Sequence, residues 1–228
     1  MLRTRSGLRV LVAAVVVAAS AGIASVVTSE SAQAAAPTSC TSTRGAFVPT
    51  QARISHIGRV QVIVVGKNSD GSMGTPPLTN AGKRQLAWFR GGSKPGSGRG
   101  GVATDAHSWP DGSALGNALY AKVFKGDTVI LSDASNRHRT CYRVTSRQQF
   151  NRSAVPMNRV VRGNGKGQIL SIVVCSGQRL GPGNWTQRTV WTAVAIAPPK
   201  PKSTPSPKPS PSPAPSSGGL LGGLLGGL

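Results

Sequence analysis

Three residues of this chain, His107, Cys175 and Arg188, are of the types that covalent acyl transfer requires. Cys175 follows the apolar run 169–174, and Arg188 lies thirteen residues later in a second strand-like run. A thiolate can attack a carbonyl carbon, an imidazole can carry the proton, and a guanidinium can stabilise the oxyanion that develops. The three side chains would therefore suffice for thioester chemistry if the fold brought them together.

Each of these residues also has a simpler structural interpretation. A free cysteine on an apolar strand is often an inert buried thiol, although the position of Cys175 at the end of its run favours reactivity. Arg188 is one of many arginines, and Arg179, which we expect in a loop over residues 178–180, is the nearest competitor for the same role.

Two other histidines and one aspartate must also be weighed against His107. We expect His56 in the opening strand and His138 in a turn. The choice of His107 over these two rests on the family resemblance described below. Asp105 lies close to His107, but we expect its side chain to point away from the imidazole and assign it no catalytic role. The candidate site is His107, Cys175 and Arg188.

Short motifs occur in a fixed order along most of the chain. Residues 173–177 and 185–190 could form a cysteine strand, a loop and an arginine strand. Other segments of the set, in chain order, are 49–66, 70–73, 76–77, 87–89, 94–96, His107, Leu119 and 125–129. This ordered set resembles the sortases, and within that family the class F sortases of actinobacteria. The resemblance covers residues 49–197.

The resemblance implies a mainly β fold, an eight-stranded closed β-barrel with one or two short helices. It also implies catalytic roles for Cys175, His107 and Arg188, with no cofactor or metal. The implied reaction cleaves a sorting-signal peptide of an exported protein through a thioester. The acyl group is then transferred to a cell-wall amine or to water.

Two departures from the family pattern give a second hypothesis. Ala106 stands where the family usually has glycine before the histidine, and Val174 where it usually has threonine before the cysteine. Alanine excludes some backbone angles that glycine allows, and valine lacks the threonine hydroxyl. The alternative is therefore a sortase-fold binding module with weakened catalysis, attached to the anionic cell wall.

Other chemistries fit the sequence less well. Amidase-type cysteine peptidases place the cysteine before the histidine, which is the reverse of the order here. Cysteine transpeptidases that cross-link peptidoglycan carry a His-Gly-Cys signature, which this sequence lacks. The three cysteines and three histidines show no metal-ligand spacing. The glycines over residues 91–101 precede an expected strand rather than a helix, so they do not form a phosphate-binding loop.

The hydrophobic pattern predicts short strands separated by Gly, Pro, Asn and Asp clusters. Expected strands cover residues 60–65, 101–104, 128–132, 139–145, 168–174 and 189–196. Short helices are expected over 79–89 and 113–123. Many short strands with few helices are typical of a sandwich or closed barrel.

The composition changes at both ends of the chain and divides it into five segments. Residues 1–34 are expected to be a signal peptide or signal anchor, since a basic start precedes the apolar run 10–27 and a small-residue cleavage site at 32–34. Residues 35–48 are an N-terminal arm and 49–197 the barrel domain. A Pro/Ser-rich linker over 198–217 and a Gly/Leu-rich tail over 218–228 follow. We expect an exported protein, extracellular or at the cell surface, with cleavage or membrane anchoring left open.

The chain has three cysteines, so one is left over if two pair. A bridge between Cys40 and Cys141 would tie the arm to the domain and leave Cys175 free. The alternative is that Cys40 and Cys141 are both unpaired. An oxidising compartment outside the cell permits the bridge.

The charge is strongly positive, with 27 Lys+Arg against 6 Asp+Glu and a net charge of +21. Such a surface attracts polyanions, and anionic wall polymers are one candidate partner. The basic residues are scattered and aromatic residues make up only 4% of the chain, which argues against a stacking platform for nucleic acid. A basic surface without a specific partner is the simpler interpretation.

Overall fold

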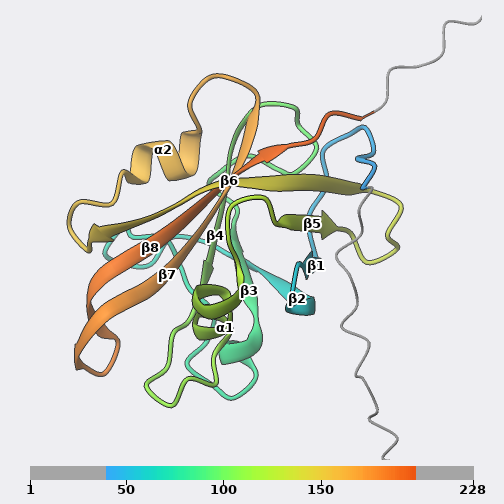
Figure 1. Ribbon diagram of the computed structural model, residues 1–228. Coiled ribbons are helices and arrows are strands. Elements are labelled where there is room, and N and C mark those ends of the chain that lie inside the picture. Colours follow the sequence, from blue (N-terminus) through green and yellow to red (C-terminus); the bar gives the residue numbers. More distant parts are fainter. Residues whose placement is uncertain (1–39, 199–228) are drawn as a thin grey trace, which may run out of the picture. The chain divides into compact units, whose positions relative to one another are not determined.

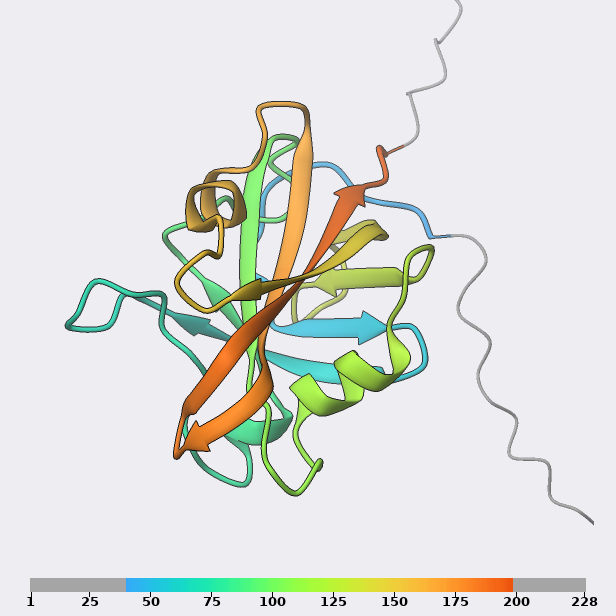
Figure 2. The ribbon, with the colours of Figure 1, turned by 60° about the vertical axis from the view of Figure 1, so that its left-hand side comes forward.

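The computed structural model describes residues 40–198 and forms a closed β-barrel (Figures 1 and 2). Around the barrel the strands follow the order β1-β2-β3-β4-β7-β8-β6-β5. The expected mainly β fold with an eight-stranded closed barrel and short helices is therefore confirmed. The segments expected as a leader, the Pro/Ser-rich linker after its first residue, and the Gly/Leu-rich tail lie outside the described residues.

The strands vary from four to fourteen residues. They are β1 (Gln51–Ile54), β2 (Gly58–Val65), β3 (Leu86–Phe89), β4 (Gly100–Ala106), β5 (Thr128–Ser132), β6 (Arg139–Asn151), β7 (Gln168–Gly181) and β8 (Asn184–Ala195). Two α-helices, α1 (Leu115–Lys122) and α2 (Met157–Arg162), and one 3-10 turn (Gly82–Arg84) complete the fold. None of the helices within residues 40–198 is long and apolar enough to cross a membrane.

Side chains alternate between the barrel interior and its outer surface, as the period of two in a β-strand requires. On β7, Leu170, Ile172 and Val174 belong to the interior core. Val173 lies on the other face, in a smaller outer cluster with Val160 of α2. Because β7 is covered on both faces over these residues, its sequence is a continuous apolar run rather than an alternating one.

The expected strands are all present, but several extend beyond the apolar runs. β6 continues to Asn151 and β7 to Gly181, well past the predicted ends at residues 145 and 174. These extensions pair with β8 in two long antiparallel ribbons. Backbone hydrogen bonds to a neighbouring strand, rather than apolar side chains, maintain them, so hydrophobic pattern alone did not reveal them.

Three local expectations were wrong. Residues 79–89 are not one helix, because a short 3-10 turn ends at Arg84 and β3 begins at Leu86. All four residues of β3 are buried, and burial on both faces hides the strand period. Helix α2 was not expected, and His56 lies in the turn between β1 and β2, with φ of 62°, rather than in a strand.

The N-terminal arm is held against the barrel by a disulfide between Cys40 and Cys141. Ser42 supports the same attachment, since its hydroxyl donates to the carbonyl of Ile196 and accepts from the amide of Cys141 at 3.1 Å. The bridge that the sequence left open is thus present, and Cys175 is the free cysteine of the described residues.

Candidate active site

Cys175 and Arg188 face each other across two neighbouring strands. In the antiparallel register of β7 and β8 they are direct partners. Side chains of directly opposed residues lie on the same face of the sheet, with Cβ atoms roughly 5 Å apart. Cys175 is half-buried, whereas Val174 before it is fully buried in the core. The thiol therefore lies on the outer face of the barrel, beside the arginine.

His107 reaches the same face through the parallel pairing of β4 and β7. The last pair in that register is Ala106 with Val174, so His107 follows next to Cys175. The hydroxyl of Ser108 donates a 2.6 Å hydrogen bond to the carbonyl oxygen of Cys175, which ties the histidine segment to the cysteine strand. The fold thus brings together the three residues predicted from the sequence.

Helix α1 fixes the backbone of the histidine from the other side. The amide of Gly116 donates to the carbonyl oxygen of His107 at 2.8 Å. A Cβ at Gly116 would lie 2.5 Å from that oxygen and 2.7 Å from the Ser108 hydroxyl. Glycine is thus required here for close approach of the helix to the histidine segment.

The imidazole of His107 is oriented by the loop between β2 and β3. Its Nε2 lies 2.6 Å from the carbonyl oxygen of Pro76. A carbonyl can only accept, so Nε2 carries the proton. Nδ1 has no hydrogen bond within the described residues and is the nitrogen left for proton exchange.

Backbone carbonyls hold one end of the Arg188 guanidinium. Its Nη1 donates to the carbonyl oxygens of Trp185 at 3.2 Å and Gln187 at 2.9 Å. Arg188 makes no ion pair with an acidic residue in residues 40–198. The other N–H groups of the planar guanidinium have no carboxylate acceptor there and can donate to an oxyanion.

Two charged neighbours have opposite effects on the pKa of the Cys175 thiol. Burial raises the pKa of Cys175, the positive charge of Arg188 lowers it, and the negative charge of Asp105 raises it. Burial is the largest of these effects, because a thiolate loses solvation when it leaves water. Arg188 therefore favours the nucleophilic form and Asp105 opposes it.

The prediction that Asp105 points away from the site was wrong. Asp105 and His107 are two residues apart, an even spacing that places both on one face of an extended strand. Asp105 pairs with Val173, two residues before Cys175, and lines a cavity of about 530 Å³ together with Arg188. Burial raises its pKa to about 7, and Arg188 partly opposes the shift.

This cavity lies beside the three-residue site and is mostly apolar. Apolar side chains such as Phe89 and Val173 form its walls. Its charged lining is one acid, Asp105, and four basic residues, namely Lys67, Arg152, Arg162 and Arg188. Cys175 and His107 do not line it. It could accommodate an apolar side chain of a peptide whose backbone passes Cys175.

The competing residues lie elsewhere or have other partners. His56 hydrogen-bonds Asp127 and His138 hydrogen-bonds Asp133, both on exposed turns. Arg179 lies in β7 rather than in a loop, where it is exposed and pairs with Trp185. Within residues 40–198, no three His, Cys, Asp or Glu side chains cluster closely enough to hold a metal ion.

The two departures from the family pattern face the barrel interior. Ala106 is 1% exposed, Val174 is 0% exposed, and the two are direct partners in the β4–β7 register. Both belong to the interior core, on the opposite side of the sheet from Cys175. A hydroxyl at residue 174 would therefore point into the core and not towards the thiol.

Similar solved structures come from one family. The chain's structural neighbours are sortases. Sortase A of Listeria monocytogenes is 17% identical, with a TM-score of 0.47, 66% of this chain covered and 89% of that one. Streptococcus agalactiae sortase C1 is 15% identical (TM-score 0.48; 68% and 71% covered), and Clostridium perfringens sortase D5 is 14% identical (TM-score 0.46; 68% and 83% covered).

No protein-family model matches this sequence. No curated protein matches it either. The likeness to these structures is one of fold.

Proposed function

We propose that this protein is a sortase-like cysteine transpeptidase of class F that acts on exported proteins. The observation that carries the proposal is the meeting of Cys175, Arg188 and His107 on one outer face, each from a different strand or strand end. A thiol, an imidazole and a guanidinium in this arrangement are the groups that thioester formation needs.

The first half of the proposed reaction forms a thioester. Nδ1 of His107 takes the thiol proton, and the sulfur of Cys175 attacks the carbonyl carbon of a substrate peptide bond. The carbonyl π electrons move to oxygen, and the free donors of Arg188 stabilise that oxyanion. When the oxyanion collapses, the C–N bond breaks, and the leaving amine takes the proton from His107.

The second half releases the acyl group. An amine of the cell wall, or water, attacks the thioester carbon and gives a proton to Nδ1 of His107. The C–S bond then breaks, and the thiolate takes that proton back to restore the cysteine. Because the reaction forms and breaks bonds without change of oxidation state, it needs no redox cofactor. The neighbouring cavity would receive a side chain of the sorting signal and so place the scissile bond.

The alternative, a sortase-fold binding module with weakened catalysis, rests on Ala106 and Val174. Their burial on the interior face argues against it, because neither side chain reaches the thiol. The negative charge of Asp105 beside Cys175 is the observation that favours it, since that charge disfavours the thiolate. A test of acyl-enzyme formation separates the two.

The decisive experiment incubates the protein with a panel of sorting-signal peptides and measures covalent adducts by intact-protein mass spectrometry. A transpeptidase gives an adduct at Cys175 that an added amine removes, whereas Cys175→Ala gives none. Arg188→Lys should form the adduct ~10²-fold more slowly while remaining folded, because lysine lacks the planar fork. Turnover by Cys175→Ala equal to that of the unaltered protein would exclude the proposal.

A further inference from the structure

Two arginines lie directly opposite each other on the outer face of the barrel. Arg53 of β1 pairs with Arg59 of β2 in the antiparallel register. Both are exposed, and neither forms an ion pair or hydrogen bond through its guanidinium within the described residues. Like charges in directly opposed positions repel and destabilise a sheet. An anion between the two guanidinium groups would convert this repulsion into attraction.

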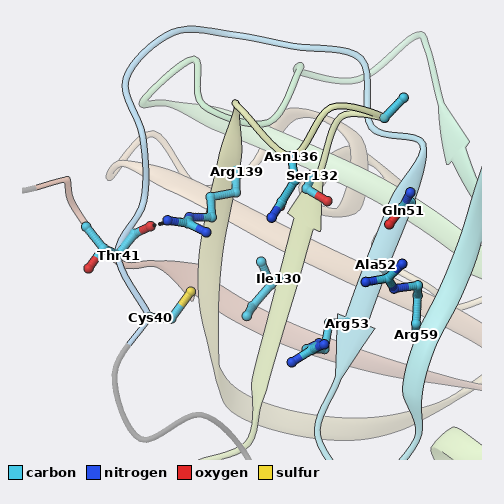
Figure 3. A pocket seen from close by; sticks show the side chains of 11 residues that line it. Cys40, Thr41, Gln51, Ala52, Arg53, Arg59, Ile130, Ser132, Asn136 and Arg139 are labelled. Carbon is cyan, nitrogen blue, oxygen red and sulfur yellow. Dashed lines mark hydrogen bonds between the residues drawn. The ribbon is translucent and has the colours of Figure 1, made fainter.

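A third arginine, Arg139 of β6, lines the same cavity as these two, with its side chain turned towards Thr41 (Figure 3). The register places Arg53 beside Ile130 of β5, and the next row of the same face contains Gln51, Ser132 and Arg139. Arg139 is thus two strands across and two residues along from Arg53, a separation of roughly 12 Å that two arginine side chains can span. In Figure 3 the side chains of Arg53 and Arg59 lie on one side of Ile130 and that of Arg139 on the other.

The surface between these side chains is concave and positively charged. The three arginines line a cavity of about 420 Å³ with Gln51, Ser132 and Asn136, which add polar groups, and no acidic or aromatic side chain lines it. The nearby carboxylates have other partners, since Asp127 binds His56 and Asp133 binds His138. An anion entering this cavity would meet no competing negative charge on its walls.

One of the three arginines is already oriented. The Nε of Arg139 donates a 3.1 Å hydrogen bond to the carbonyl oxygen of Thr41, drawn in Figure 3. Thr41 follows Cys40, which the disulfide holds to Cys141 on the same strand as Arg139. The covalent tie thus fixes the acceptor that aims this guanidinium, and a fixed side chain loses less entropy on binding.

We propose that Arg53, Arg59 and Arg139 form a binding site for a phosphate-bearing polymer. Planar guanidinium groups bind phosphate oxygens through paired hydrogen bonds. They bind carboxylates in the same way, so binding of a poly-carboxylate is the competing outcome of the test. The absence of aromatic side chains from the lining removes the stacking on which single-stranded nucleic acid depends. The polymer is therefore bound by its phosphates and not by bases.

The site lies opposite the thiol. β1 and β7 are four strands apart in both directions around the eight-stranded barrel. A polymer bound at β1, β2 and β6 would leave the face of Cys175 open to substrates. The proposed site is thus separate from the chemistry at Cys175, and each of the two proposals can be refuted without the other.

The test compares two full-length variants with the same loss of charge. Arg53→Gln/Arg59→Gln/Arg139→Gln removes the site, and Arg84→Gln/Arg90→Gln/Arg99→Gln removes three exposed arginines that line neither this cavity nor the one beside Cys175. Binding of fluorescently labelled inorganic polyphosphate is measured by anisotropy over a salt series. We expect the site variant to bind at least ~10-fold more weakly with a shallower salt dependence, and the control to change less than ~3-fold.

Further probes define what would overturn the proposal. Equal weakening in the two triple variants would mean that only net charge matters. An equal loss of poly-glutamate binding in the site variant would refute the preference for phosphate. Tighter binding of single-stranded DNA than of polyphosphate would show that the partner class is wrong. Circular dichroism and covalent labelling of Cys175 verify that both variants remain folded, whatever the outcome for transpeptidation.

Discussion

At the scale of single residues, the site depends on how two charges act on one thiol. Arg188 lowers the pKa of Cys175 and Asp105 raises it, while burial raises it most. Substitution of each charged neighbour in turn tests its effect on the thiol, although Arg188 also lowers the pKa of Asp105. Asp105, which sequence reasoning set aside, is therefore the residue whose substitution is most informative.

Substitution of either charged neighbour should shift the pH at which Cys175 reacts. Asp105→Asn removes a negative charge, so the pKa of the thiol should fall and iodoacetamide should label it faster at pH 7. Arg188→Gln should have the opposite effect. Labelling rates across pH 6 to 10, measured by mass spectrometry, test both. A shift in the same direction for both variants would contradict the opposed charges.

Asp105 should also make stability depend on pH. Burial raises its pKa to about 7 in the folded protein against 3.8 in the reference state, so folding favours the protonated form. Its favourable contribution is complete below pH 4 and is lost as the pH rises to 7 and beyond. Asp105→Asn should therefore be about 1–2 kcal/mol more stable than the unaltered protein at pH 8, because partial exposure reduces the full effect.

Urea unfolding at pH 4 and pH 8 measures that difference. At pH 4 the advantage of Asp105→Asn should nearly vanish, since the carboxyl group is then largely protonated in the folded protein. Asp111→Asn is the control, because hydrogen bonds from Ser113 lower the pKa of Asp111 and its loss should bring no gain at pH 8. A constant gain for Asp105→Asn at both pH values would refute the assigned burial effect.

At the scale of elements, the site is assembled from three strands and one helix. β7 and β8 supply Cys175 and Arg188, the end of β4 supplies His107, and the start of α1 holds the histidine backbone. Within residues 40–198, one side-chain hydrogen bond, from Ser108 to the carbonyl of Cys175, ties the histidine segment to the cysteine strand. The relative position of imidazole and thiol should be sensitive to it.

Removal of this hydroxyl should lower turnover more than stability. Ser108→Ala loses one hydrogen bond, which costs about 1 kcal/mol of folding free energy. The looser histidine segment should lower kcat by ~3- to 10-fold, because proton transfer needs a fixed distance. Ser113→Ala is the matched control, since its hydroxyl binds Asp111 away from the thiol. Equal rates for the two variants would mean that Ser108 does not position His107.

At the scale of the whole molecule, the barrel is closed and the N-terminal arm is fastened to it. The disulfide joins residues 101 positions apart, so it restricts most of the domain in the unfolded chain. Cys175 is left as the free thiol within residues 40–198. Stability and thiol chemistry are thereby assigned to different cysteines.

Opening this bridge should weaken the fold without removing the nucleophile. Cys40→Ser/Cys141→Ala should lower the free energy of unfolding by ~2–4 kcal/mol, because the unfolded chain regains entropy. Denaturant unfolding measures the loss, and labelling at Cys175 should persist in the folded variant. If the double variant and the unaltered protein unfold at the same denaturant concentration, the bridge does not restrict the unfolded chain.

The sequence by itself determined most of the strand content and supplied the three candidate site residues. Apolar runs and turn residues located β2, β4, β5 and most of β7, because such patterns report burial directly. Residue type, chain order and the resemblance to sortases together selected His107, Cys175 and Arg188, whose catalytic roles belong to the proposed function. The disulfide between Cys40 and Cys141 was only one of two options, since pairing depends on distance in space.

Only the tertiary structure decided which residues share a face and a cavity. The pairing registers placed Asp105 near the thiol. They also directed the side chains of Ala106 and Val174 towards the interior core. The same registers gathered Arg53, Arg59 and Arg139 from three strands. A register is fixed by hydrogen bonds between residues far apart in the chain. A period of two within one strand therefore predicts alternation but not which distant residue lies opposite.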